Sequence, residues 1–337
     1  MQRQAIHYFV NSNSSRGYVS FYESNFGALE RVVPLHGYPL KPLGNLLEDI
    51  CDCAAEQKRR VEWIHNCLDN TPEGIILPDL SAGVINIPFY AEHNALNLLE
   101  DYNIRQTRKA LDEAHALFAA ALHIHDEWEK VYIGKMDFRA ADELAKETET
   151  RLIGDRHTEK KGRAIDRYFG AATVNGSFDY IANITQCLGK RYFIKGRPGT
   201  GKSTLLKKLV KKAVDAGFEA EVYHCAFDPQ SLDMLVVREL DFCIFDSTSP
   251  HEYFPSLPTD EIIDVYEAAV EPGTDEKNAK KLTQFQHDYK EQVGKATEKL
   301  RLAKESYDRA QQTHLSRLDK AACKESAEQI KSTLFRT

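Results

Sequence analysis

The sequence predicts an α/β protein built from two tandem three-layer modules, each with a parallel sheet and each followed by a long helical arm. Three observations predict this fold class: an internal repeat, strand-like runs that alternate with helix-like runs, and apolar heptad-like seams beyond the alternating part of each copy. Alternating strands and helices are typical of parallel sheets that helices cover on both faces. At 337 residues the chain is long enough for two domains of ordinary size.

The internal repeat appears when the sequence is shifted against itself by about 159 residues. The aligned positions include His7-Tyr8-Phe9 with Arg167-Tyr168-Phe169, Gly37 with Gly196, Leu46-Leu47 with Leu205-Leu206, Glu62 with Glu221, and Asp69 with Asp228. Matches spread over a long stretch with almost no gaps indicate a duplication. We therefore predict one module over residues 1–160 and a second over residues 161–337.

Each copy begins with a β-like run that leads into a glycine-bearing turn, Arg31–Leu35 in the first and Arg191–Ile194 in the second. A helix follows in the second copy, because its apolar residues recur at helical spacing until Gly217 stops it. Two further strands are expected at Glu219–His224 and Phe242–Phe245, with a loop between them.

The last part of each copy has a heptad-like seam of apolar residues. The seam positions are Leu111, Ala114, Phe118, Ala121, His125, Trp128 and Tyr132 in the first copy, and Leu282, Phe285, Tyr289, Ala296, Leu300, Ala303, Tyr307, Ala310 and His314 in the second. Such seams need a partner helix. The two arms either pack together, within one chain or between the subunits of a homodimer, or bind another protein. Alternatively, each arm lies on its own domain.

One motif in the second copy points to chemistry. The run Gly196-Arg197-Pro198-Gly199-Thr200-Gly201-Lys202-Ser203 fits G-x-x-x-x-G-K-[ST], between an expected strand and an expected helix. Its glycines let successive backbone N–H groups form a nest for phosphate at the positive end of the helix dipole. The predicted nucleotide-binding residues are Gly196, Arg197, Pro198, Gly199, Thr200, Gly201, Lys202, Ser203 and Thr204. The modules are therefore expected to be P-loop NTPase-like.

Catalytic roles are predicted for Lys202, Asp246 and Asp228. Lys202 should reach the β- and γ-phosphates, while Ser203 and Asp246 should bind Mg²⁺, since Asp246 ends an apolar strand. Asp228 could orient a water molecule or an acceptor hydroxyl, with support from His224. Alternatively, Asp246 only opens the turn that follows it and Asp228 only caps a loop. The lysines of the following helix are either a solvated face or a contact for an acidic partner.

The first copy lacks these groups. Leu40 and Pro42 stand where nest glycines should be, Leu43 replaces the lysine, and Asn86 replaces Asp246. Proline also removes an amide donor. We therefore expect the first copy to bind no nucleotide. It could instead close the site of the second copy and supply an arginine finger, for which the candidates are Arg31, Arg59 and Arg60.

At these motifs the chain resembles a little-characterised bacterial family of tandem P-loop ATPases. The resemblance rests on Tyr168-Phe169, the run from Ile194 to Thr204, Tyr223-His224-Cys225, and Asp246-Ser247-Thr248-Ser249-Pro250-His251. It covers nearly the whole chain and implies ATP binding. Members of this family usually have an intact first P-loop as well, and this sequence departs from them there.

The leading expectation is a Mg²⁺-dependent ATPase that uses only the second copy, with ATP and Mg²⁺ as cofactors. The alternatives are a nucleotide or small-molecule kinase, with Asp228 on the acceptor, and a slow nucleotide-sensing protein. No N/T-K-x-D motif for guanine is present, which favours ATP over GTP. A net charge of −7 argues against nucleic acid as a partner, and no apolar run is long enough to span a membrane. Seven cysteines without framework spacing favour a cytoplasmic protein with reduced thiols.

Overall fold

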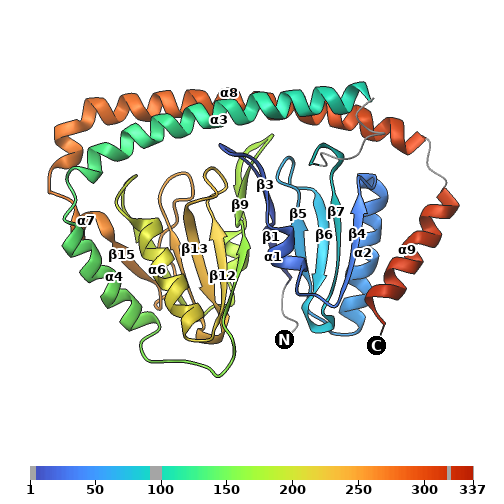
Figure 1. Ribbon diagram of the computed structural model, residues 1–337, viewed down its shortest axis with the longest axis horizontal. Helices are drawn as coiled ribbons and strands as arrows, with labels where there is room; N and C mark the ends of the chain where they lie inside the picture. Colours follow the sequence, from blue (N-terminus) through green and yellow to red (C-terminus); the bar gives the residue numbers. More distant parts are fainter. Residues whose placement is uncertain (1–4, 92–100, 317–319, 337) are drawn as a thin grey trace.

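The computed structural model of the chain describes residues 5–91, 101–316 and 320–336 (Figure 1). The elements of the first half are β1 (Ile6–Phe9), β2 (Asn11–Ser14), β3 (Gly17–Ser20), α1 (Tyr22–Phe26), β4 (Arg31–His36), α2 (Leu40–Glu56), β5 (Glu62–His65), β6 (Pro72–Leu77), η1 (Pro78–Leu80), β7 (Ala82–Ile87), η2 (Phe89–Ala91), α3 (Tyr102–Ile133) and α4 (Phe138–Leu152).

The second half repeats this order of elements as far as its fifth sheet strand. Its elements are β8 (Arg163–Arg167), β9 (Gly170–Thr173), β10 (Gly176–Asp179), α5 (Ile181–Thr185), β11 (Lys190–Lys195), α6 (Lys202–Asp215), β12 (Glu219–His224), β13 (Leu232–Val237), η3 (Arg238–Leu240), β14 (Phe242–Asp246), β15 (Glu261–Asp264), α7 (Val265–Ala269), α8 (Thr274–Ser316) and α9 (Lys320–Leu334).

The two main sheets have the same strand order. The first reads β1-β5-β6-β7-β4, and the second reads β8-β12-β13-β14-β11 with β15 added at its edge. The fold is thus mixed α/β, and the expectation of purely parallel sheets was wrong. The strands β6 and β13 run antiparallel to both of their neighbours. Sequence reasoning took the β13 segment as loop, although a short link such as η3 is enough for an antiparallel return.

The strand register corrects the alignment of the repeat by one residue at its start. Tyr8 pairs with Ile64 in the first sheet, and Arg167 pairs with Tyr223 in the second, so Tyr8 corresponds to Arg167. Phe9 then corresponds to Tyr168, and these two residues bond to each other. Each N–H donates to the other's C=O over 2.9 Å. Reciprocal bonding between equivalent residues is the pattern expected at a two-fold axis, so the halves are related by a local pseudo-two-fold.

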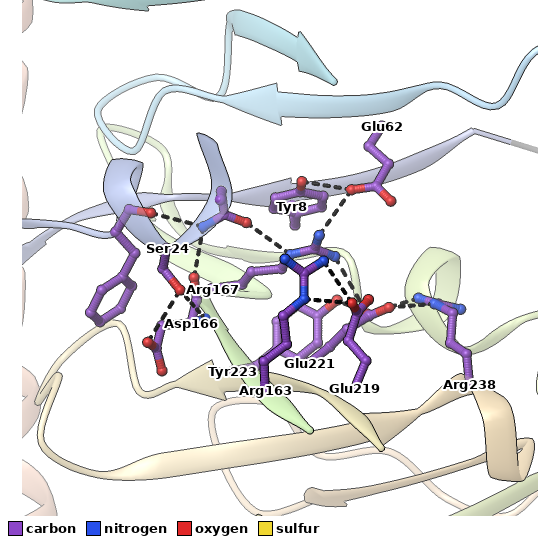
Figure 2. A network of polar contacts seen from close by, with 12 residues as sticks. Tyr8, Ser24, Glu62, Arg163, Asp166, Arg167, Glu219, Glu221, Tyr223 and Arg238 are labelled. Atoms are coloured by element: carbon purple, nitrogen blue, oxygen red, sulfur yellow. Dashed lines mark hydrogen bonds and ion pairs between the residues drawn. The ribbon is translucent and has the colours of Figure 1, made fainter. Parts of the chain in front are cut away.

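A buried arginine joins the halves near this axis (Figure 2). The Arg167 guanidinium lies 3.0 Å from a Glu62 carboxylate oxygen of the first half and 3.5 Å from a Glu221 oxygen of its own half. It also stacks on the Tyr8 ring, 4.1 Å from the centroid. Around it, one apolar cluster includes inward-facing residues of both sheets, among them Ile64 and Val236. Because an unpaired buried charge is costly, this network favours one relative placement of the sheets.

The helical arms pair with each other across the top of both sheets (Figure 1). Helix α3 has 32 residues, α8 has 43, and the two run antiparallel along most of α3. Their seams interlock through buried residues such as Ala114, Phe118, Leu300 and Ala303. Of the arrangements that the sequence left open, the structure has the one in which the two arms pack together within one chain. In the described part of the chain, no helix is long and apolar enough to cross a membrane.

The helices that follow the arms cross over to the opposite half. Helix α4 packs against α6 and α7 of the second half, whereas α9 packs against α2 and β4 of the first. The outer face of each sheet is therefore covered by one of its own helices and one supplied by the other half (Figure 1). The domain boundary near residue 160 stays a prediction. Each repeat gives a helix to the other repeat's packed unit, so the packing does not mark this boundary.

We expect Leu300→Ala to lower the free energy of unfolding by about 2–5 kcal/mol, because this fully buried side chain fills the α3–α8 seam. Leu302→Ala is the matched control, since Leu302 lies on the same helix with 49% of its surface exposed, and it should change the value by less than about 0.5 kcal/mol. Urea unfolding of both variants measures the difference. Equal losses of unfolding free energy in the two variants would contradict the burial of Leu300 between α3 and α8.

Candidate functional site

The glycine-rich run forms a compact loop between β11 and α6. Gly199 and Gly201 have φ angles of +75° and +86°, a region that L side chains rarely adopt. Thr200 is buried, and its hydroxyl donates to the Arg197 carbonyl over 2.8 Å, which fixes the turn. The loop ends at the N-terminus of α6, where Gly201 is the cap residue. Backbone N–H groups at such a terminus favour an anion.

The structure brings Lys202 and Asp246 together beside this loop. Parallel pairing places Asp246, the last residue of β14, opposite Ile194 near the end of β11. The Lys202 ammonium donates to the Arg197 carbonyl over 2.8 Å and lies 3.5 Å from an Asp246 carboxylate oxygen. The Thr248 hydroxyl donates to the other Asp246 oxygen over 2.6 Å. Asp246 therefore both opens its turn and faces the lysine.

Ser203 lies on the first turn of α6, next to Lys202. Its hydroxyl oxygen accepts the Leu232 N–H over 2.9 Å, so the start of β13 lies against the loop. A hydroxyl and a carboxylate are hard oxygen donors of the kind that Mg²⁺ prefers. Ser203 and Asp246 thus have the donor chemistry for this ion.

Asp228 and His224 are not bonded to each other. Asp228 accepts from Arg16 Nε over 2.8 Å, and Arg16 belongs to the β2–β3 turn of the first half. The His224 ring nitrogens lie 2.9 Å from an Asp166 carboxylate oxygen and 2.7 Å from the Pro229 carbonyl oxygen. The expectation that His224 supports Asp228 was therefore wrong, because both of its ring nitrogens have other partners.

Sequence reasoning missed the contribution of α3 to the loop. A Cβ added at Gly199 would lie 2.9 Å from the Glu129 carbonyl oxygen and 2.9 Å from its Cβ, so α3 lies directly against the loop. Burial raises the pKa of the Glu129 carboxyl above its usual range, and the Gly199 N–H acts in the opposite direction. A carboxyl group thus lies beside loop N–H groups that could bind a phosphate.

His125 lies one helical turn before Glu129 and faces the same site. Burial lowers the pKa of the His125 imidazole, with a further effect of the Lys202 charge in the same direction. Donor atoms of His125, Asp126 and Glu129 all lie within 4.8 Å of one another, so this group could also hold a cation. The spacing of His125 and Glu129 on one helix face is visible in the sequence. Their target is not, because it lies in the other half.

Arg197 connects the loop to α7 and to the start of α8. Its guanidinium lies 2.9 Å from an Asp275 carboxylate oxygen at the start of α8 and 4.8 Å from the centroid of the Tyr266 ring. The Tyr132 hydroxyl, near the end of α3, donates to the other Asp275 oxygen over 2.8 Å. The loop therefore contacts both arms where they leave the second half.

The corresponding loop of the first half is closed by its own side chains. Helix α2 begins at Leu40, the residue that corresponds to Gly199, whereas α6 begins three residues later in the repeat. The Asn86 amide exchanges two hydrogen bonds with the Tyr38 backbone, of 2.7 and 3.2 Å. The Leu40 N–H donates to Gln311 of α8 over 3.3 Å. Gln311 thus makes the contact that Glu129 makes in the second half, but without charge.

The three arginines expected as fingers lie at the wrong edge of the first sheet. Arg31 begins β4, and Arg59 and Arg60 precede β5, so all three are at the amino ends of strands whose carboxyl ends lead to the loops. Arg31 donates to the Leu80 carbonyl over 2.7 Å, and Arg60 pairs with Asp79 over 2.7 Å. None of these three arginines can therefore act as the finger. They lie at the amino ends of the strands, and the loops lie at the opposite edge of the sheet, beyond the carboxyl ends.

No protein-family model, curated protein or solved structure matches the chain significantly. The geometry of the site itself is therefore the basis for its chemistry.

We expect Gly199→Ala to lower the free energy of unfolding by about 1–3 kcal/mol, since the new Cβ would meet the Glu129 backbone at 2.9 Å and the φ of +75° disfavours alanine. Gly294→Ala in α8 is the control, because nothing lies within 4 Å of the added Cβ there. Helix propensity makes that change neutral or stabilising by up to about 1 kcal/mol. Two equally mild effects would count against the close approach of α3 to the loop.

Proposed function

We propose that the chain is a Mg²⁺-dependent ATPase with one nucleotide site, in the second half, and that the first half is a non-binding structural or regulatory copy. The observation that carries this proposal is the loop from Gly196 to Ser203, with two positive-φ glycines and with Lys202 beside Asp246. A lysine held by a carboxylate and a carbonyl, at the N-terminus of a helix, is placed to exchange those partners for phosphate oxygens.

In this proposal the loop N–H groups and Lys202 bind the β- and γ-phosphates. Ser203 and Asp246 hold Mg²⁺, which neutralises part of the phosphate charge when it is bound. Lys202 then places its charge beside the β- and γ-phosphate oxygens, where negative charge moves toward ADP as the bond to the bridging oxygen breaks. The first half is assigned no phosphate because α2 and Asn86 fill its loop. ATP is preferred over GTP because the sequence has no guanine-recognition motif.

Lys202→Ala should lower the rate of phosphate release from ATP by at least about 100-fold, because it removes the cation at the phosphates. Lys208→Ala is the matched control. Lys208 lies on the same helix and pairs with the exposed Asp142 over 2.6 Å, so its loss should leave turnover nearly unchanged. The assay runs with Mg²⁺-ATP, with and without a panel of nucleosides and metabolites.

Phosphate release without an acceptor supports the ATPase. Transfer of the phosphoryl group to an added metabolite would replace it with the kinase, and tight binding without turnover would replace it with the nucleotide sensor. Equal turnover in Lys202→Ala and the wild type would refute the site altogether.

Glu129→Gln should tighten ATP binding by about 10-fold, equivalent to about 1.4 kcal/mol, because the amide keeps the shape of the carboxylate and removes its repulsion of phosphate. The same chemistry occurs naturally at the loop of the first half, where Gln311 of α8 accepts the Leu40 N–H. Glu127→Gln is the control, since Glu127 lies on the same helix and pairs with the exposed Lys130. Titration with a fluorescent ATP analogue measures both affinities.

The raised pKa of Glu129 gives this difference a pH dependence. As the pH falls, the wild-type carboxylate takes up a proton and loses its charge, so the two affinities should converge. If the difference in ATP affinity between the wild type and Glu129→Gln grew toward acidic pH, the proposed repulsion between Glu129 and phosphate would be contradicted.

A further inference from the structure

The β2–β3 hairpin of the first half docks on the second half, on the loop that follows β12. The Ser15 N–H donates to the Phe227 carbonyl over 3.0 Å, and the Ser15 hydroxyl donates to the same oxygen over 2.8 Å. The Ser12 hydroxyl donates to the Ala226 carbonyl over 2.6 Å. These bonds fix the tip of the hairpin, and the next residue in the turn is Arg16.

Arg16 is thereby held next to Asp228. Its Nε donates to an Asp228 carboxylate oxygen over 2.8 Å, and 41% of the Arg16 side chain is exposed. Within the described part of the chain, neither terminal nitrogen of the guanidinium has a hydrogen-bond partner. The planar fork of arginine can bind a carboxylate through Nε and a phosphate through its terminal nitrogens.

Asp228 belongs to the charged surroundings of the loop. Its charge affects the pKa of His125 and of Glu129, and Lys202 acts on the same two groups. Asp246 acts on His125 as well. Geometry links Asp228 to the loop as well. The Ser231 hydroxyl donates to an Asp228 carboxylate oxygen over 3.3 Å, and the N–H of the next residue, Leu232, donates to the Ser203 hydroxyl over 2.9 Å.

The second half provides an internal comparison. Its β9–β10 hairpin docks on the first half in the same way, with the Val174 N–H donating to the Leu68 carbonyl over 2.9 Å. The turn is also built alike, because the Asn175 and Arg16 N–H groups each donate over 3.1 Å to the hydroxyl two residues earlier. Asn175 thus occupies the position of Arg16. The hairpin that docks on the half with the glycine loop has arginine, and the hairpin that docks on the half with the closed loop has asparagine.

We propose that Arg16 is the catalytic arginine that the first half supplies to the nucleotide site of the second. This inference rests on the proposed ATPase function and assigns the finger to a different residue from the three that the sequence suggested. When Mg²⁺-ATP is bound, the terminal nitrogens of Arg16 contact γ-phosphate oxygens while Nε keeps its bond to Asp228. The water oxygen bonds to the γ-phosphorus, the bond to the β–γ bridging oxygen breaks, and ADP keeps that electron pair. One water proton is released as inorganic phosphate forms.

The test compares Arg16→Ala, Arg16→Lys and Arg60→Ala in the full chain. Arg60 is the matched control, because it forms an equally short and similarly exposed ion pair with Asp79 at the far edge of the first sheet. We expect Arg16→Ala to lower kcat at least about 100-fold with the ATP affinity changed less than about 3-fold. Arg16→Lys should recover little, since lysine cannot form the fork. Arg60→Ala should change kcat less than about 2-fold.

A second measurement separates catalysis from hairpin docking. Binding of Mg²⁺-ADP with aluminium fluoride, which mimics the transferring phosphoryl group, should weaken in Arg16→Ala while binding of Mg²⁺-ADP alone should not. Unchanged kcat in Arg16→Ala, or full recovery in Arg16→Lys, would overturn the assignment and leave Arg16 as a structural tie. If wild-type protein bound no ATP, the proposed function itself would fail. If it bound ATP without turnover, the ATPase would give way to the nucleotide sensor. If the wild type hydrolysed ATP and Arg16→Ala did so equally fast, only the role of Arg16 would fail.

Discussion

The antiparallel pairing of α3 with α8 is the constraint on which the rest of the structure depends. Each helix starts over one half of the molecule and ends over the other, and their apolar seams are buried against each other and against residues of the loops below, such as Tyr90 and Phe227. Small side chains such as Ala114 and Ala303 allow a close approach. The register of this pair determines what meets the two loops. It places Glu129 against Gly199 and Gln311 on the Leu40 N–H. The glycine-rich loop of one half is thus contacted by a helix of the other.

The two halves share a backbone plan and differ in its chemistry. Both have a strand, a turn after glycine, a helix, and a contact from the opposite arm at the same loop position. At that surface of the second half lie Lys202, Asp246 and Glu129, and the Arg16 hairpin docks on the loop after β12. In the first half the equivalent surface is closed by Asn86 and by apolar residues such as Leu40 and Phe89.

Sequence reasoning predicted the α/β class, the repeat, the paired arms and the neighbourhood of Lys202 and Asp246, because each depends on local periodicity or on a short motif. It missed β13, which looks like loop until its antiparallel neighbours are known, and it shifted the first strand by one residue. The roles of Glu129 and Arg16 could not be read at all, since each is placed by contacts between residues far apart in the chain. The candidates Arg31, Arg59 and Arg60 failed because they were chosen by residue type alone. The direction of the neighbouring strand, which decides at which edge of the sheet a residue lies, was not considered.

The number of Mg²⁺-ATP molecules bound per chain tests the central claim most directly. Isothermal titration of the full-length protein with a non-hydrolysable ATP analogue and Mg²⁺ gives this number. We expect one bound molecule per wild-type chain and none after Lys202→Ala. Two molecules per wild-type chain would show that the first half also binds nucleotide. No binding by the wild type would contradict the assignment of the loop from Gly196 to Ser203 as a nucleotide site.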